Sequence, residues 1–170
     1  MTRVEPADAF STSAPPGALR RRSSYLYGLI ISGAVLATAG QALRLAWVGA
    51  AVFGTLVIYW AAETYVHWMA ARSVHGRDLT REERLRTVRD GWPLVTAGAI
   101  PVTVLFVEAG LGVENGLAIR VTLAVNAVLL FVVGWAMSRA SGLRGVRLVL
   151  SAAASGVLGL GMIALKTTLH

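Results

Sequence analysis

Five long apolar segments, separated by short polar connections, make up most of this 170-residue chain. Each segment holds about 20 residues or more, and at a rise of about 1.5 Å per residue a helix of that length crosses a hydrocarbon core of about 30 Å. Backbone amides inside lipid must be hydrogen-bonded within their own segment, so these segments can only be helices. The pattern predicts an all-α, polytopic membrane protein with five transmembrane helices: Ser24–Leu43, Ala46–Met69, Trp92–Leu111, Ala118–Ser138 and Val146–Leu165.

The arginines lie in alternate connections between these segments. Thirteen of the sixteen Lys and Arg residues lie in the leader, in the second connection and in the fourth; only Arg44, Arg120 and Lys166 remain for the other side. Basic connections stay in the cytoplasm, so we expect the N-terminus inside, the C-terminus outside and an odd number of spans. Most aromatic residues agree with this topology, because they lie near predicted membrane boundaries. Those near inner boundaries are Tyr25, Tyr27, Trp68, Trp92 and Trp135, and Trp47 lies near an outer one; Trp60 does not fit this pattern.

Composition narrows the class of protein further. The chain is 55% hydrophobic with a mean hydropathy of +0.62, which leaves no room for a separate soluble domain. A net charge of +7 would suggest a nucleic-acid partner in a soluble protein; here the arginines flank apolar spans, which favours anionic lipids and excludes nucleic acid. The lack of cysteine excludes disulfides and thiol chemistry. The Ala-, Gly-, Val- and Arg-rich composition is typical of a GC-rich bacterium, so we expect an inner (plasma) membrane protein.

The leader is predicted to differ from the rest of the chain. Residues 1–23 are rich in Ser, Pro and Gly with few apolar residues, so we expect a disordered cytoplasmic tail. The five-helix transmembrane domain then covers residues 24–168. An alternative is a signal peptide, because Ala37-Thr38-Ala39 follows a basic run and an apolar core and can be read as a cleavage site.

The only sizeable connection, residues 72–91, is predicted to contain a short amphipathic helix. Thr80-Arg81-Glu82-Glu83 is a capping box, in which the Thr80 hydroxyl accepts from the Glu83 amide while Glu83 reaches back. We expect the helix to run to about Arg89 and to lie on the inner leaflet. The alternative is a metal or partner site formed by acidic residues and a histidine: His75, Asp78, Glu82 and Glu83.

Glu63 is the acid furthest from either predicted membrane boundary. A charge inside a span costs about 2.5–3.5 kcal/mol on insertion scales, so it needs a partner or a purpose. His67 follows at i+4 on the same helical face, and such a pair can share a proton or hold a divalent cation. Under the competing interpretation, Glu63 is neutral or hydrogen-bonded in the bundle and His67 is merely interfacial. The supporting polar residues are Tyr59, Tyr65 and Asn126.

Other polar and small residues in the spans are expected to be structural. Asn126 is predicted to hydrogen-bond to a neighbouring helix, and Pro101 to kink the third span. A wet interfacial charge group is predicted from Glu108, Glu114 and Arg120. Small residues allow close helix approach, and their number predicts a homodimer: Gly28, Gly33, Gly156 and Gly159.

Three stretches resemble the vacuolar iron transporter family. They are Ala62-Glu63-Thr64-Tyr65 at the end of the second segment, Leu130–Gly134 with Ser141–Arg144, and the small-residue segment Val146–Gly161. The resemblance implies a five-helix fold with the N-terminus inside, a dimer, and Fe²⁺ or Mn²⁺ as substrate. Members carry Asp-Gly early in the first helix, where this chain has Tyr27-Gly28, so only Glu63 is carried over as a site residue.

Two functions follow from these observations, and enzyme motifs are absent. The first is a small bacterial inner-membrane protein of transporter-like fold, which moves a divalent metal or couples to protons through Glu63 and His67. The alternative is a non-transporting accessory or envelope-organising membrane protein. A transporter needs a continuous polar path, and the spans offer only Glu63 and Asn126 towards one.

Overall fold

The computed structural model describes residues 17–40, 44–142 and 144–169, which form seven helices and no strand. They are α1 (Ala18–Thr38), α2 (Leu45–His75), α3 (Arg81–Gly91), α4 (Pro93–Ala97), α5 (Ala99–Gly110), α6 (Asn115–Ala140) and α7 (Val146–Leu169). The all-helical prediction is confirmed for these residues. Residues 1–16 of the predicted tail, and Gln41–Leu43 at the end of the first predicted span, lie outside the described residues.

Four helical stretches of the described chain are long and apolar enough to cross a membrane. They are Leu45–Val74, Arg81–Gly110, Asn115–Ala140 and Val146–Thr168. The first predicted span corresponds to α1, whose apolar part from Ser24 to Thr38 has about 15 residues and a length of about 22 Å. The fifth crossing therefore stays a prediction.

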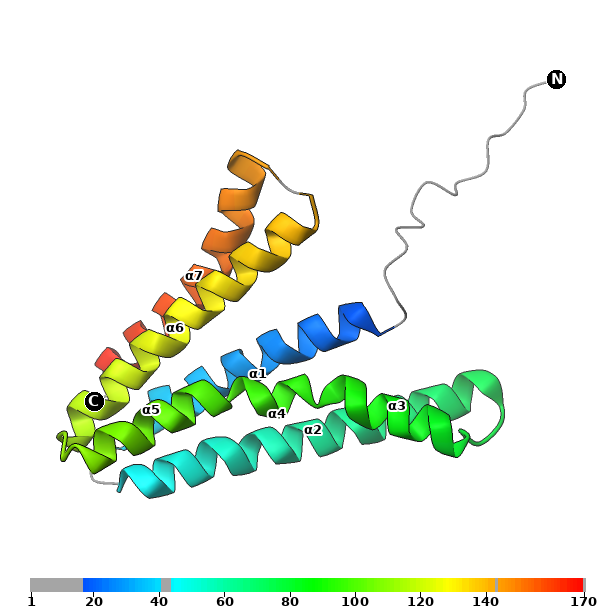
Figure 1. Cartoon of the computed structure of the whole chain (residues 1–170), viewed down its shortest axis with the longest axis horizontal. Helices are drawn as coiled ribbons and strands as arrows, with labels where there is room; N and C mark the ends of the chain where they lie inside the picture. Colours follow the sequence, from blue (N-terminus) through cyan, green and yellow to red (C-terminus); the bar gives the residue numbers. More distant parts are fainter. Residues whose placement is uncertain (1–16, 41–43, 143, 170) are drawn as a thin grey trace.

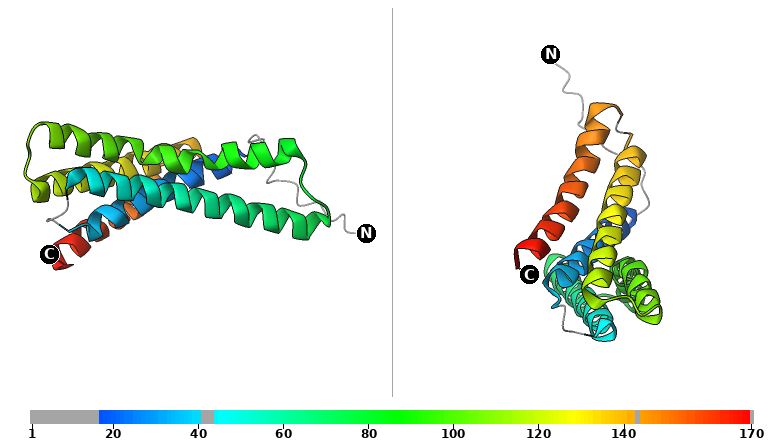
Figure 2. Two further views of the ribbon diagram at one scale, coloured as in Figure 1. Left: turned by 90° about the horizontal axis from the view of Figure 1, so that it is seen from below. Right: turned by 90° about the vertical axis from the view of Figure 1, so that its left-hand side faces the viewer.

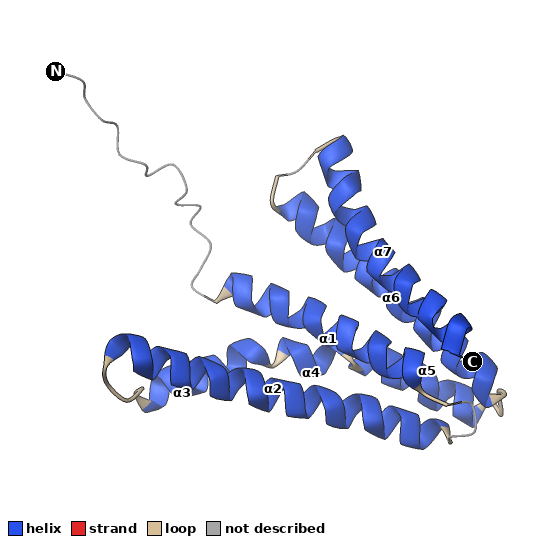
Figure 3. Cartoon of the chain, turned by 180° about the vertical axis from the view of Figure 1, so that it is seen from behind, coloured by secondary structure: helices blue, strands red, loops and turns tan. Residues whose placement is uncertain are grey.

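The helices form an elongated bundle with α1 at its centre (Figures 1 and 2). The α2 helix runs antiparallel to the bent rod made by α3, α4 and α5, and α1 packs against both. The α6–α7 hairpin meets the others at the end where the C-terminus lies and diverges from them towards its own turn (Figure 3). Since α1 contacts α2, α3, α4, α6 and α7, most of its surface is covered by protein.

The core lies where α1, α2, α5 and α6 meet. It is built almost entirely of aliphatic side chains with 0–2% exposure: Leu36, Val48, Val52, Leu56, Leu105, Ile119 and Leu123. Many large apolar residues point outward instead, for example Phe53, Ile58 and Leu160, which are 54–69% exposed. Such a surface suits lipid contact and is unusual for a water-soluble monomer.

The first helix begins earlier than predicted. It starts at Ala18, so Arg20, Arg21 and Arg22 lie on α1 and do not belong to a disordered tail. Arginine is a good helix former, and two of these side chains are held by acids on other helices, as described below. The predicted tail therefore does not include residues 18–23, which are helical.

The predicted capping box is confirmed, and the helix that follows packs against α2, while its position on the inner leaflet stays a prediction. The Glu83 amide donates to Thr80 Oγ1 at 3.3 Å and the Thr80 amide donates to Glu83 Oε2 at 2.8 Å. The α3 helix then continues through Trp92 into α4 and packs along the end of α2 (Figure 1). The α2 helix extends to His75, so the connection predicted over residues 72–91 is reduced to residues 76–80.

The expected kink of the third span occurs just before Pro101. The rod is interrupted at Gly98, between α4 and α5. A proline ring clashes with the carbonyl four residues earlier, which here belongs to Ala97. Gly98 also allows a close approach to α2, because a Cβ added there would lie 2.2 Å from Leu56 Cδ1.

The small residues are used inside the monomer. A Cβ on Gly28 would lie 2.2 Å from the Leu94 carbonyl oxygen, and one on Gly33 would lie 2.2 Å from Met162 Sδ. One on Gly159 would lie 2.8 Å from Ala127 Cβ. Because these glycines already pack against residues of the same chain, they no longer argue for contacts between two copies. The homodimer stays a prediction.

Candidate functional site: a charged junction of the first three helices

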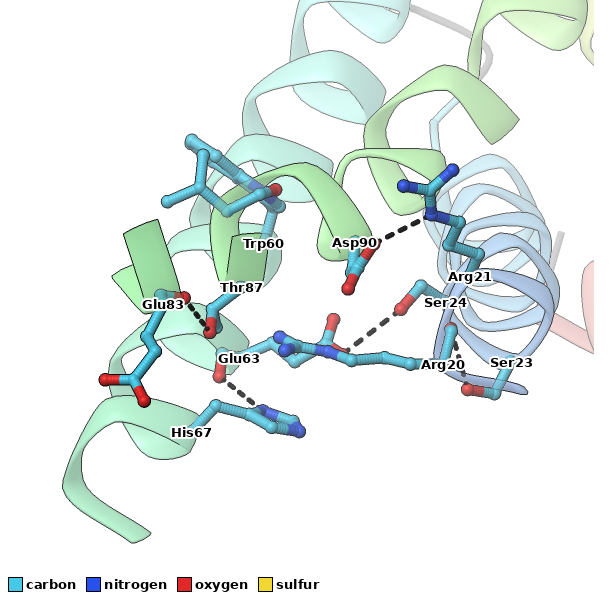
Figure 4. A network of polar contacts seen from close by, with 11 residues as sticks. Arg20, Arg21, Ser23, Ser24, Trp60, Glu63, His67, Glu83, Thr87 and Asp90 are labelled. Atoms are coloured by element: carbon cyan, nitrogen blue, oxygen red, sulfur yellow. Dashed lines mark hydrogen bonds and ion pairs between the residues drawn. The ribbon is translucent and has the colours of Figure 1, made fainter. Parts of the chain in front are cut away.

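Glu63 takes its partners from α1. Its Oε1 accepts a hydrogen bond from Ser24 Oγ at 3.2 Å and lies 3.6 Å from Arg20 Nε (Figure 4). The Arg20 and Glu63 side chains are 18% and 24% exposed, and Ser24 is buried. A guanidinium this close compensates the carboxylate charge at the edge of the apolar region, where solvation by water is incomplete.

His67 does not pair with the Glu63 carboxylate as predicted. Its Nδ1 lies 2.9 Å from the main-chain oxygen of Glu63, and since a carbonyl can only accept, Nδ1 carries the proton in this contact. The ring is exposed at the protein surface. The Arg20 side chain from α1 reaches the Glu63 carboxylate, and the His67 imidazole bonds instead to the main-chain oxygen of Glu63, one turn earlier on α2 (Figure 4).

A second ion pair fixes α1 to α3. Arg21 Nε donates to Asp90 Oδ1 at 2.8 Å, and Asp90 is only 7% exposed. Gly17, which precedes α1 with a φ of 95°, passes so close that a Cβ there would lie 2.7 Å from Asp90 Oδ2. We call these five residues the charged junction: Arg20, Arg21, Ser24, Glu63 and Asp90.

Sequence reasoning missed Arg20, Arg21 and Asp90 as site residues. The signal was present in the three consecutive arginines at the start of a helix, which need acidic partners if they pack against protein. It is weak, because the same arginines serve as topology signals at a membrane boundary. Only the packing of α1 between α2 and α3 selects Glu63 and Asp90 as their partners.

Trp60 bridges α2 and α3 beside the junction. Its indole Nε1 donates to the Val88 main-chain oxygen at 3.2 Å, and its ring meets Trp92 edge to face with centroids 5.3 Å apart. This inter-helix role explains why Trp60 departs from the interfacial pattern of the other aromatic residues. Tyr59 and Tyr65, predicted as supporting residues, are 53% and 61% exposed on α2 and lie outside the charged junction.

Several buried polar atoms at and near the junction have no hydrogen-bond partner within the described part of the protein. They are Arg20 Nε and Nη2, Glu63 Oε2, Thr64 Oγ1 and Trp68 Nε1. Most buried polar atoms in proteins are hydrogen-bonded, so this is the most under-satisfied polar region of the described bundle. In the described part of the chain, no group of three or more His, Cys, Asp or Glu side chains is placed to hold a metal ion.

Asn126, Glu108 and Lys166 are buried further along the bundle and each forms a hydrogen bond there, although Asn126 Oδ1 has no partner among the described residues. Asn126 Nδ2 donates to the Leu29 main-chain oxygen at 3.0 Å, which is the predicted bond between helices. Glu108, predicted to lie in a wet charge group, is instead 8% exposed and accepts from Thr122 Oγ1 at 2.9 Å. The reason is that α5 and α6 pack along each other there. Lys166 on α7 is also buried and donates to the Ala39 main-chain oxygen.

Comparisons of the chain with family models, with curated proteins and with solved structures give no match. The vacuolar iron transporter resemblance therefore stays a prediction that rests on three short stretches of the sequence.

Proposed function

We propose that this chain is a five-span bacterial inner-membrane protein with the N-terminus inside. Four apolar helices support membrane insertion. The α1 N-terminus and the α2–α3 and α6–α7 turns lie on one side of the bundle, and the C-terminus lies on the other (Figure 1). The arginine-rich segments thus share one side, as the positive-inside rule requires for a cytoplasmic face.

We propose further that the protein is a non-transporting accessory or envelope-organising protein. The observation that carries this proposal is the Arg20–Glu63 contact at 3.6 Å. A cation that entered between Glu63 and His67 would meet a guanidinium already placed at the carboxylate, and like charges oppose its binding. Further along the bundle, the centre is filled by aliphatic side chains such as Leu36, Leu56 and Leu123.

Transport of a divalent metal or of protons through Glu63 and His67 is the second candidate. It is favoured by Glu63 Oε2, which is buried without a hydrogen-bond partner in the described residues, and by the exposed imidazole one turn away. If Fe²⁺ or Mn²⁺ is the substrate, those two side chains supply only two ligands, and the rest must come from another subunit or from water.

Proteoliposomes distinguish the two functions. The accessory proposal expects no uptake of Mn²⁺ or Fe²⁺ and no proton flux above protein-free liposomes, for the wild type and for Glu63→Gln alike. It also expects Glu63→Gln and Arg20→Gln to lower the unfolding midpoint, because both break one structural pair. Uptake by the wild type that is lost in Glu63→Gln, with normal folding and assembly, would establish transport and contradict the accessory proposal.

A further inference from the structure

A basic hollow lies on the α1–α3 side of the bundle, on the solvent side of the charged junction. It has a volume of about 300 Å³. Its lining comes from one residue of α1 and five of α3: Arg21, Glu82, Leu85, Arg86, Arg89 and Asp90. Three guanidinium groups therefore face two carboxylates, which gives the hollow a net positive charge.

The two carboxylates in the hollow are already compensated. Asp90 is buried and bound by Arg21 at 2.8 Å. Glu82 is 86% exposed and lies 3.6 Å from Arg86. Arg89 has no ion pair with any described residue, so its charge is available to a ligand. An anion in this hollow thus meets the guanidinium of Arg89, which has no ion pair, and those of Arg21 and Arg86, each of which has an ion pair with one acid.

The position of the hollow indicates where the anion comes from. Trp92, 48% exposed, directly follows α3, and the apolar helix α4 begins at Pro93. Arg89 and Arg86 precede Trp92 by three and six residues, or about 4.5 Å and about 9 Å along the helix axis. An interfacial tryptophan marks the headgroup level of a bilayer, so we expect these guanidinium groups at the depth of the lipid phosphates if the chain is inserted as proposed.

An exposed apolar side chain borders the same hollow. Leu85 is 62% exposed on α3 and lines the hollow beside the arginines. A free inorganic anion gains nothing from such a neighbour, whereas the glycerol and upper acyl region of a lipid does. We propose that this hollow is a binding site for the phosphate headgroup of an anionic phospholipid, contacted by Arg21, Arg86 and Arg89. The site is independent of whether Glu63 takes part in transport.

The α3 helix supplies a matched control for this proposal. Arg81 and Arg84 lie on the same helix and line a neighbouring hollow that shares Leu85 with the first, and neither forms an ion pair with a described residue. They precede Trp92 by eleven and eight residues, so they lie further along α3 from this tryptophan than Arg86 and Arg89 do. Arg86→Gln/Arg89→Gln and Arg81→Gln/Arg84→Gln therefore remove the same charge from the same helix at different faces. Both double variants keep Arg21 and its bond to Asp90, and therefore the attachment of α1 to α3.

Native mass spectrometry of the full chain in detergent, titrated with phosphatidylglycerol, tests the site. We expect Arg86→Gln/Arg89→Gln to weaken lipid binding about tenfold or more, since one basic residue near the surface corresponds to a factor of about five. Arg81→Gln/Arg84→Gln should stay within about twofold of wild type, and Arg86→Lys/Arg89→Lys should retain most of the affinity. Circular dichroism confirms that each variant is folded.

Three results would overturn the proposal. Equal losses in the two Gln double variants would show a general charge effect without a site. Phosphatidylcholine bound as tightly as phosphatidylglycerol would show that headgroup charge is not recognised. Displacement of the lipid by inorganic phosphate alone would assign the hollow to a free anion.

Discussion

Arg20 Nε lies 3.6 Å from Glu63 Oε1, and this contact joins the start of α1 to the middle of α2. The neighbouring residue, Arg21, binds Asp90 on α3. Two consecutive arginines thus attach one helix to two others at the edge of the apolar region. The charged junction therefore has a structural role, because it holds α1 against α2 and α3.

A double-mutant cycle tests the Arg20–Glu63 pair. Arg20→Gln and Glu63→Gln should each destabilise the protein by about 1–2 kcal/mol, because each leaves a partly buried charge without its partner. The double variant should lose less than the sum, with a coupling of at least about 0.5 kcal/mol. Reversible unfolding in SDS gives these values. Arg22→Gln, at an exposed position, is the control and should change stability by less than about 0.5 kcal/mol; strictly additive losses would show that the pair is not coupled.

The predicted topology can be read with reporters. A green fluorescent protein fused after His170 should be dark and alkaline phosphatase fused there should be active, because both report an outside C-terminus. The matched fusion inserted at Gly76, in the exposed α2–α3 turn, should give the opposite result. Fluorescence at both positions would mean an even number of spans after Gly76 and would contradict the predicted topology.

Substitutions at the small residues separate internal packing from dimer contacts. Gly33→Leu should lower the unfolding midpoint strongly, because its side chain would overlap Met162 and Asn126. Gly54→Leu is the control, since a Cβ added at Gly54 meets nothing within 4 Å in the monomer. If the predicted homodimer is formed through Gly33, light scattering in detergent should show monomers for Gly33→Leu. An unchanged dimeric mass would assign Gly33 to internal packing alone.

The α2–α3 turn should show an unusually acidic carboxyl group. Glu83 accepts two hydrogen bonds from Arg77 and one from the Thr80 amide, and these lower its pKa from the usual 4.5 to about 2. Because the pKa of Glu83 is lower in the folded state than in the unfolded state, its contribution to the stability of the folded protein is complete above about pH 4.5. It is lost as the pH falls through about 2. NMR titration of the Glu83 side chain checks this expectation, and Arg77→Gln should move the pKa back towards 4.5. A wild-type value near 4.5 would contradict the Arg77 contact.

Local features of the chain were predictable because their causes lie within one segment. Apolar length gives the helices, and the capping box of α3 is a four-residue pattern whose hydrogen bonds the structure shows. The break before Pro101 follows from the lost backbone bond and the clash with residue 97. The bond from Asn126 to another helix was also expected, since a buried amide inside a span needs a partner.

The charged junction could not be predicted, because its members lie far apart along the chain. Glu63 and His67 are neighbours on α2, so a sequence pattern favours their pairing; Arg20, from α1, occupies the carboxylate instead. The same holds for Glu108, which looked interfacial by position and is buried because α6 brings Thr122 against it. The sequence by itself determined the helices and the asymmetry of the arginines, which depend on local hydropathy. The tertiary structure alone decided which charges meet, because helix packing brings together residues such as Arg20, Glu63 and Asp90 that no local interaction connects.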